Sequence, residues 1–267
     1  MLQYFCVSDV HSYFSILQKT LDDNGFDINN PDHVLVVCGD LFDRGDESSA
    51  LYEFVRSLPD ERFIYIRGNH EDLLIDCFDQ IQDCEIISPH HISNGTVKTI
   101  MDLSGVSEKD YIQFVYDPYS LIRGNALDKI PKIINYINKK CVNYVEIGDF
   151  IFVHGWIPFA KEELHTGKIK YTLLPNWRDC NWNRARWENG MDAWHHGIKL
   201  EGRTIVCGHW HCSWGWSHIR QERQEFPQKN KTNWLDSFEV FADDGIIALD
   251  ACTAYSGKIN CIVLEVE

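Results

Sequence analysis

Short apolar runs, each as long as a β-strand and each followed by polar residues, recur along this chain. They lie at residues 2–7, 34–38, 63–66, 150–153 and 204–207. Amphipathic, helix-like segments at 14–23 and 47–57 separate the first three runs. The resulting strand-plus-helix units repeat at about 30 residues, the length of a βαβ unit. The pattern predicts an α/β fold (α+β by some schemes), with central β-sheets flanked by helices.

The remaining chain carries weaker signals of secondary structure. Residues 72–145 mix helical patterns with turn signals and predict a mainly helical insertion. Residues 161–202 are rich in Trp, His and Asn and predict a long loop region near a site. From residue 238 onward, short alternating runs predict closing antiparallel strands. We therefore expect residues 1–267 to form a single catalytic domain with a helical insertion at about 72–145.

Composition limits the partners and the compartment. The formal net charge of −15 disfavours nonspecific binding to nucleic acid or to an anionic membrane. The ten cysteines are scattered, and several fall in apolar runs, which is typical of reduced, buried thiols. No apolar stretch approaches the ~18 residues of a membrane span. We predict a cytoplasmic protein that binds neither nucleic acid nor membrane.

Polar clusters follow five of the apolar runs, where open α/β sheets place their ligand sites. They are Asp9-Val10-His11, Gly39-Asp40-Leu41-Phe42-Asp43-Arg44-Gly45, Gly68-Asn69-His70-Glu71, His154-Gly155 and Gly208-His209-Trp210-His211. Any one of them could be a helix cap or a turn. Together they supply carboxylate, imidazole and amide groups, the mixed oxygen and nitrogen set that Mn, Fe or Zn accepts. The sequence therefore predicts a metal site at these strand ends.

In sequence order, the motifs DVH, GDLFDRG, GNHE, HG and GHWH resemble those of the calcineurin-like metallophosphoesterases. The DRG and GNHE forms are similar to the phosphoprotein phosphatase branch, which includes serine/threonine phosphatases and symmetrical diadenosine tetraphosphatases. The late segments 182–187 and 249–258 are also similar to motifs of that branch, whereas the insertion is not matched. The resemblance implies the layered metallophosphoesterase fold and a metal-dependent phosphatase.

The resemblance also implies two divalent or trivalent metal ions, with Mn favoured and Fe or Zn as alternatives. Their ligands would be Asp9 and His11 on the first metal, Asp40 bridging both, and Asn69, His154 and His209 on the second. His211 lies two residues beyond His209, and in the broader superfamily a second histidine at this place is a ligand of the first metal. The alternative is a histidine that faces the substrate or supports a ligand.

Roles in catalysis follow from the same resemblance. A hydroxide held between the metals would attack phosphorus, while Arg44, Asn69 and Arg184 would bind the phosphate. Among the late arginines, Arg184 is favoured over Arg186 because similar phosphatases use the arginine directly after Asn.

Protonation of the leaving group would fall to His70, whose ring can face the substrate when the amide of Asn69 faces the metal. Asp43 would orient His70 through its second ring nitrogen. Glu71 is expected to be a residue of the first helical turn rather than a catalytic group.

Four functions could follow from these motifs. The leading one is hydrolysis of phosphomonoesters, on protein Ser/Thr or on a small molecule. The rival is hydrolysis of diadenosine tetraphosphate or a related dinucleoside polyphosphate, which the Gly-His-Trp sequence at 208–210 favours. The acidic balance and the DRG motif disfavour a nuclease or phosphodiesterase. Because every expected ligand and the general acid are present, a non-catalytic scaffold is also disfavoured. The many tryptophans are expected to pack rather than to stack on a nucleobase.

Overall fold

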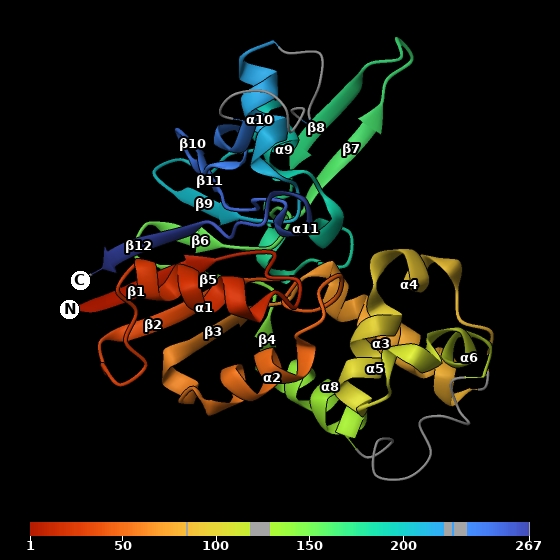
Figure 1. The fold of residues 1–267 in the computed structure, drawn as a ribbon. Helices are drawn as coiled ribbons and strands as arrows, with labels where there is room; N and C mark the ends of the chain where they lie inside the picture. The colour runs from red at the N-terminus through yellow and green to blue at the C-terminus, as the bar shows by residue number, and fades with distance from the viewer. Residues whose placement is uncertain (84, 118–128, 222–225, 227–233, 267) are drawn as a thin grey trace.

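The computed structural model describes residues 1–83, 85–117, 129–221, 226 and 234–266. Two five-stranded sheets dominate it. Figure 1 shows how their strands and the helices around them are arranged. The first has the strand order β12 (Cys261–Val266), β1 (Leu2–Val7), β2 (His33–Cys38), β3 (Phe63–Ile66) and β4 (Cys141–Val142). The second has the order β10 (Phe241–Asp243), β11 (Ile246–Ala248), β9 (Thr204–Cys207), β6 (Phe150–Phe152) and β5 (Val145–Ile147).

The two sheets pack face to face. Alternation along β2 shows how: Leu35 and Val37 belong to the core beneath the helices, whereas Val36 and Cys38 belong to the core between the sheets. Phe152 and Val206 supply the second sheet's side of that inner core. All six residues of β2 are buried, which explains why this strand is a continuous apolar run rather than an alternating one.

Helices cover the outer faces of both sheets. The first sheet is covered by α1 (Phe14–Asp23), α2 (Ser48–Ser57), α3 (Asn69–Gln82), α5 (Thr96–Ser104) and α8 (Lys129–Lys140). The second is covered mainly by α9 (Gly190–His195) and α10 (Cys212–Ile219). The remaining helices of the described residues are α4 (Pro89–Asn94), α6 (Tyr111–Tyr116) and α11 (Thr253–Ser256), with 3-10 turns η1 (Asp60–Arg62), η2 (Glu108–Asp110), η3 (Trp177–Asp179), η4 (Ala185–Trp187) and η5 (Trp234–Phe238). The predicted layered α/β fold is confirmed.

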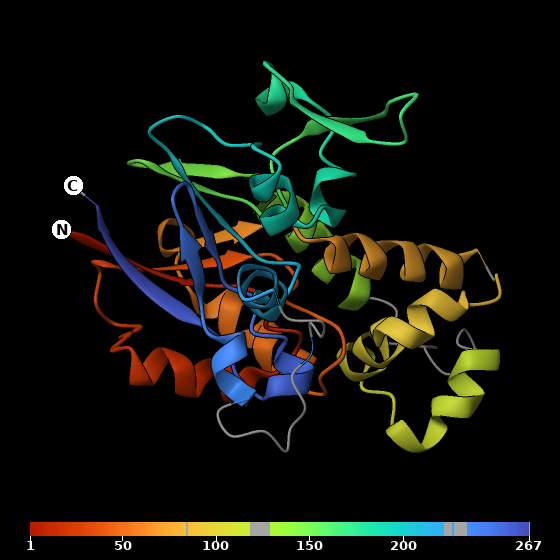
Figure 2. The same cartoon turned by 90° about the horizontal axis from the view of Figure 1, so that it is seen from above.

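The segment predicted as a helical insertion contains most of α3 and all of α4, α5, α6 and α8, followed by the short β4. Figure 2 shows these helices grouped at one end of the sheets, away from the two chain termini. Within the described ranges, no helix is long and apolar enough to cross a membrane.

Three predictions of secondary structure were wrong. Residues 161–202, expected as loop, include most of a hairpin of β7 (Phe159–Glu163) and β8 (Ile169–Leu173), together with α9. The run at 238–241, expected as a strand, is instead the end of η5 followed by the first residue of β10. The closing strands are also not all antiparallel, because β11 pairs with β9 in parallel; β12 does pair antiparallel with β1.

Candidate metal centre

The five polar clusters converge where the strands of the two sheets end. Among the residues that the structure describes, two groups of side chains are close enough to share a cation, each with one ligand atom per residue within 4.8 Å of the others. One group is His11, Asp40 and His70, and the other is Asp40, His154 and His209. Asp40 belongs to both, so a carboxylate lies where a residue bridging two metals would be needed.

Asp9 and Asn69 lie beside these groups. Asp9 Oδ1 is 3.9 Å from His11 Nε2, while Asp9 Oδ2 accepts hydrogen bonds from Ser8 Oγ at 2.5 Å and from the His209 backbone N–H at 2.9 Å. Asn69 Oδ1 lies 2.9 Å from His154 Nε2. The structure therefore brings together all six ligands that the resemblance implies.

Backbone carbonyls hold the candidate histidine ligands. His11 Nδ1 donates to the Phe42 carbonyl at 3.0 Å, and His154 Nδ1 donates to the Cys38 carbonyl at 2.7 Å. Each of these two rings thereby turns Nε2 toward Asp40. A hydrogen bond on one ring nitrogen fixes the tautomer and orients the other, as metal-ligating histidines require.

The tight approach of strand ends also depends on Gly39. Its φ of +83° is in the left-handed region, and an added Cβ would lie 2.4 Å from His154 Nδ1 and 2.8 Å from the Gly68 Cα. Only glycine allows both the backbone conformation and the contact. A positive φ also occurs at six candidate site residues: Asp9, His11, Asp40, Asp43, Arg44 and His209. Such strain concentrates at functional sites, at about 1–3 kcal/mol per residue.

The electrostatics of His11, His209 and Asp40 suit a cation. Burial lowers the pKa of His11 well below its usual value, with Arg44 adding to the effect, and burial lowers the pKa of His209 to about 3. Both rings are therefore neutral at pH 7, which is the form that binds metal. Burial opposes the charge on Asp40, but His154 and His70 outweigh it and hold the Asp40 pKa well below its usual value. The same pairing raises the pKa of His154 to about 10 against the effect of burial.

One atom tests directly whether a metal fits. His11 Nε2 is buried and has no hydrogen-bond partner in the described part of the chain. The nearest carboxylate oxygens, on Asp9 and Asp40, are each 3.9 Å away, too far for a hydrogen bond. A buried polar nitrogen left unpaired costs about 1–3 kcal/mol. The residues present therefore fit a metal that this nitrogen would bind.

His70 and Asp43 form a second unit beside the ligands. His70 Nδ1 lies 2.7 Å from Asp43 Oδ2, and His70 Nε2 lies 3.3 Å from Arg44 Nη2. Burial opposes protonation of His70, but Asp40 and Asp43 together raise its pKa above the usual value. The contact between His70 and Asp43 agrees with the predicted pairing. His70 also belongs to the group with His11 and Asp40, so its position fits both a general acid and a metal ligand.

The late arginines differ in what they bind. Arg186 is buried and donates to Asp72, Asn143 and Asn183, so its guanidinium is occupied by the protein. Arg184 keeps 64% of its side chain exposed and donates to Glu188 through Nε. Arg44, predicted to bind phosphate, is also exposed. The roles of Arg44 and Arg184 remain predictions.

His211 does not join either group of ligand atoms. Its Nδ1 lies 2.7 Å from Ser213 Oγ, and its ring contacts Trp210 and Phe226. Burial, together with Arg44, lowers its pKa to about 4, so the ring is neutral. The predicted ligand role of His211 stays a prediction.

The sequence did not reveal the role of Glu71. This residue is in the first turn of α3, as expected, but its buried carboxylate joins the ends of two strands, β2 and β3. Oε2 accepts from the backbone N–H groups of Asp40 and Gly68, and Oε1 accepts from the Leu41 N–H and the Tyr65 hydroxyl. The Glu three residues after the Gly68 N-cap is a capping-box signal that could have indicated this.

Replacing Glu71 with glutamine should lower the free energy of unfolding by about 1–3 kcal/mol. The new NH₂ group would meet two hydrogen-bond donors where a carboxylate oxygen accepted both. Urea unfolding followed by circular dichroism measures the change. Glu162→Gln, at an exposed position of β7, is the matched control. Equal stability of the two variants would contradict this account of Glu71.

Comparison with known proteins gives the class. The sequence profile of the family described as calcineurin-like phosphoesterase matches residues 2–242. The chain therefore belongs to the calcineurin-like phosphoesterase family, and it is a hydrolase that acts on phosphoester bonds. The family uses divalent metals, in agreement with the two candidate groups of ligands.

The chain is also similar to solved structures at low sequence identity. A cold-active protein tyrosine phosphatase is 14% identical with a TM-score of 0.50, over 99% of this chain and 74% of that one. A protein assigned as a diadenosine tetraphosphatase is 14% identical with a TM-score of 0.48, over 98% and 89% of the two chains. A serine/threonine phosphatase from Saccharomyces cerevisiae is 16% identical with a TM-score of 0.43, over 78% and 61%. No curated protein matches the sequence.

Proposed function

We propose that this protein hydrolyses phosphomonoesters, on a phosphoprotein or a small molecule, at a centre of two metal ions. The observation that supports this best is the position of Asp40, which belongs to both groups of potential ligands. Asp9 and His11 would hold the first metal with Asp40, and Asn69, His154 and His209 would hold the second. We propose Mn as the favoured metal, with Fe or Zn as alternatives.

When bound, the two metals would supply a water activated at neutral pH and positive charge for the phosphoryl oxygens. Side chains of the protein would then bind the phosphate and protonate the leaving group. Arg44 is exposed beside His70 and would bind a phosphoryl oxygen, with Asn69 and Arg184 as further predicted contacts. His70 would donate a proton from Nε2 to the leaving alkoxide, while Asp43 holds Nδ1.

A substrate panel tests this proposal. Protein purified with Mn would be assayed on p-nitrophenyl phosphate, a phosphoserine peptide and diadenosine tetraphosphate, and its metal content measured by elemental analysis. We expect turnover of the phosphomonoesters. Turnover of the dinucleotide alone would show the phosphomonoester assignment to be wrong.

Trp187 favours the second candidate, hydrolysis of a dinucleoside polyphosphate. This residue is 45% exposed, and its ring centroid is 5.9 Å from that of His209, a proposed metal ligand. An exposed aromatic ring beside a phosphoryl site can stack on a nucleobase, which contributes about 1–3 kcal/mol per base. Trp177 and Trp182, by contrast, are buried and pack the fold.

Trp187→Ala separates the two substrates. If a base stacks on this indole, KM for diadenosine tetraphosphate should rise about 5- to 150-fold, the equivalent of that stacking energy. KM for a phosphoserine peptide, which has no base, should stay within about twofold. Unchanged KM for the dinucleotide would remove the support that Trp187 gives to this candidate.

We also propose a cytoplasmic location. The described cysteines are all free thiols, and burial raises the pKa of several, including Cys38 and Cys207, which keeps them unreactive. This usage suits a reducing compartment. Imaging of the tagged protein in its own cells would test the location.

A further inference from the structure

Helix α5 contacts the segment that carries Asp43. Thr96 Oγ1 donates a hydrogen bond to Asp43 Oδ2 at 2.7 Å, and the Asp43 backbone N–H donates to Thr99 Oγ1 at 3.0 Å. Both threonines are fully buried. Two hydroxyls of one helix therefore bind the side chain and the backbone of the residue that contacts His70.

The oxygen bound by Thr96 is the one that faces the histidine. Asp43 Oδ2 lies 2.7 Å from Thr96 Oγ1 and 2.7 Å from His70 Nδ1, whereas Oδ1 has no partner in the described part of the chain. Without the Thr96 hydroxyl, the Asp43 carboxylate would be free to rotate about χ2. With Thr96 in place, the direction of the Asp43–His70 hydrogen bond is set from both sides.

Further contacts fix α5 against the same segment. Gly95, directly before the helix, has a φ of +83°, and an added Cβ would lie 2.6 Å from the Arg44 nitrogen, so this backbone approach requires glycine. Near the other end of α5, Asp102 accepts from the Ser49 N–H at 2.8 Å, and Ser49 Oγ donates to the Asp102 carbonyl at 3.0 Å. The helix is thus held against the chain at Arg44 and again at Ser49.

We propose that Thr96 is a positioning residue for proton donation to the leaving group, acting through Asp43 on His70. This inference rests on the proposed phosphomonoesterase function. The helical segment supplies no candidate metal ligand beyond the start of α3. The proposed role of Thr96 gives this segment a part in protonating the leaving group, separate from metal binding. The described contacts of Thr96 lead to Asp43 and not to Asp9, Asp40 or His154.

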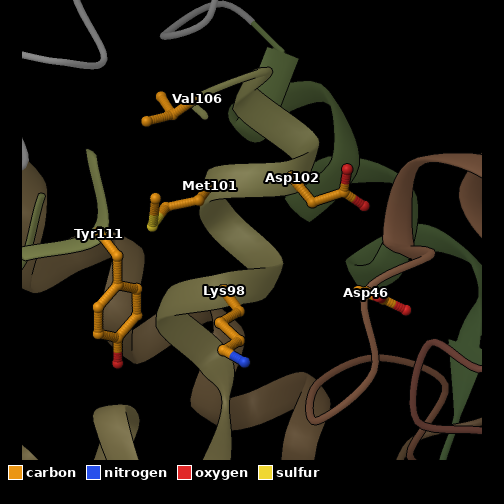
Figure 3. Close-up of a pocket in the computed structure, with 6 residues that line it drawn as sticks. All are labelled: Asp46, Lys98, Met101, Asp102, Val106 and Tyr111. Atoms are coloured by element: carbon orange, nitrogen blue, oxygen red, sulfur yellow. The ribbon is translucent and has the colours of Figure 1, made fainter. Parts of the chain in front are cut away.

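The opposite face of α5 provides a control. Lys98, Met101 and Asp102 of this helix line a cavity of about 420 Å³ with Asp46, Val106 and Tyr111. Figure 3 shows these six side chains. None of these six residues is a candidate ligand or phosphate-binding residue. Lys98 is exposed there, so Lys98→Ala changes α5 without touching the Thr96–Asp43 contact.

The test compares two substrates that differ in the leaving group alone, phenyl phosphate and p-nitrophenyl phosphate. Nitrophenolate leaves without a proton, whereas phenolate benefits from one, so loss of an aligned acid penalises phenyl phosphate more. We expect Thr96→Val to lower kcat on phenyl phosphate about 10- to 100-fold, the range for losing a group that orients a functional residue. The loss on p-nitrophenyl phosphate should be at least about fivefold smaller, with KM and metal content unchanged.

Three comparisons make the outcome decisive. Thr96→Ser keeps the hydroxyl and should restore most of the rate, while Lys98→Ala and Thr172→Val, at exposed positions, should leave it unchanged. If Thr96→Val does not fold by circular dichroism, the same assays on Thr96→Ala replace it. An equal loss on both substrates, or no loss, overturns the proposal. Wild-type protein inactive on both phosphomonoesters would instead contradict the proposed function itself.

Discussion

Asp40→Asn should abolish metal-dependent hydrolysis, with kcat/KM lower by at least about 10³-fold, or roughly 4 kcal/mol of transition-state stabilisation. The reason is that one carboxylate serves both groups of potential ligands. Its Oδ1 lies 3.2 Å from His154 Nε2, and its Oδ2 lies 3.9 Å from His11 Nε2. Asparagine keeps the shape but has no negative charge and one oxygen fewer to share between two cations. Steady-state assays with Mn supplied and elemental analysis measure the two effects.

Asp46→Asn is the matched control, because Asp46 is an exposed carboxylate only six residues further on. It should retain the wild-type rate and metal content. Wild-type turnover by Asp40→Asn in the presence of manganese would refute the bridging role.

His70→Asn should lower kcat about 10²- to 10⁴-fold on substrates with poor leaving groups. The bound metal should remain, since Asp9, His11, Asp40, Asn69, His154 and His209 are untouched. The expected loss follows from the position of His70 Nε2, which lies beside Arg44 while Asp43 holds the other ring nitrogen. Single-turnover rates on a phosphoserine peptide, with elemental analysis of the same sample, measure it.

This experiment also decides between two roles that the structure leaves to His70. The ring lies near His11 and Asp40, as a ligand would, and it pairs with Asp43, as an acid would. Loss of one metal equivalent in His70→Asn would identify a ligand and contradict the assignment as general acid. His165→Asn, in an exposed turn, should change neither the rate nor the metal content.

The strands β1, β2, β3 and β9 were predictable from the sequence because burial on both faces of a sheet leaves an uninterrupted apolar run. β1, β3 and β9 have the predicted bounds, and β2 differs by one residue. α1 was equally predictable, since Leu17 and Leu21 repeat at helical spacing and both are buried. In these elements the local pattern and the tertiary environment agree.

The hairpin of β7 and β8 was missed because its strands bury little. Glu162 and Glu163 are exposed, so no apolar alternation marks the segment, and its structure depends on pairing with residues 169–173. The prediction of a strand at 238–241 was wrong for the opposite reason. Phe238 is apolar, but it is buried among the rings of Trp234 and Tyr255 at the end of a 3-10 turn, not in a strand.

The sequence predicted those residues of the site that directly follow a strand. Asp9, Asp40 and Asn69 follow strands that lie side by side, so order along the chain translated directly into proximity. The supporting residues were not predictable in this way. Thr96 acts on a side chain 53 positions away, and two of the donors to Glu71 are backbone N–H groups 30 and 31 positions away. Such contacts have no fixed spacing in sequence.

The hydrogen bond from the His209 N–H to Asp9 joins positions 200 residues apart, and the one from Thr253 Oγ1 to the Asp9 carbonyl joins positions 244 apart. Contacts of such long sequence separation form late, because closing a long loop costs entropy before any contact compensates for it. During synthesis, Asp9 and Asp40 would therefore leave the ribosome well before the histidines of the second sheet. A cation captured at that stage would have few ligands and would exchange freely, so selection of the metal belongs to the completed fold.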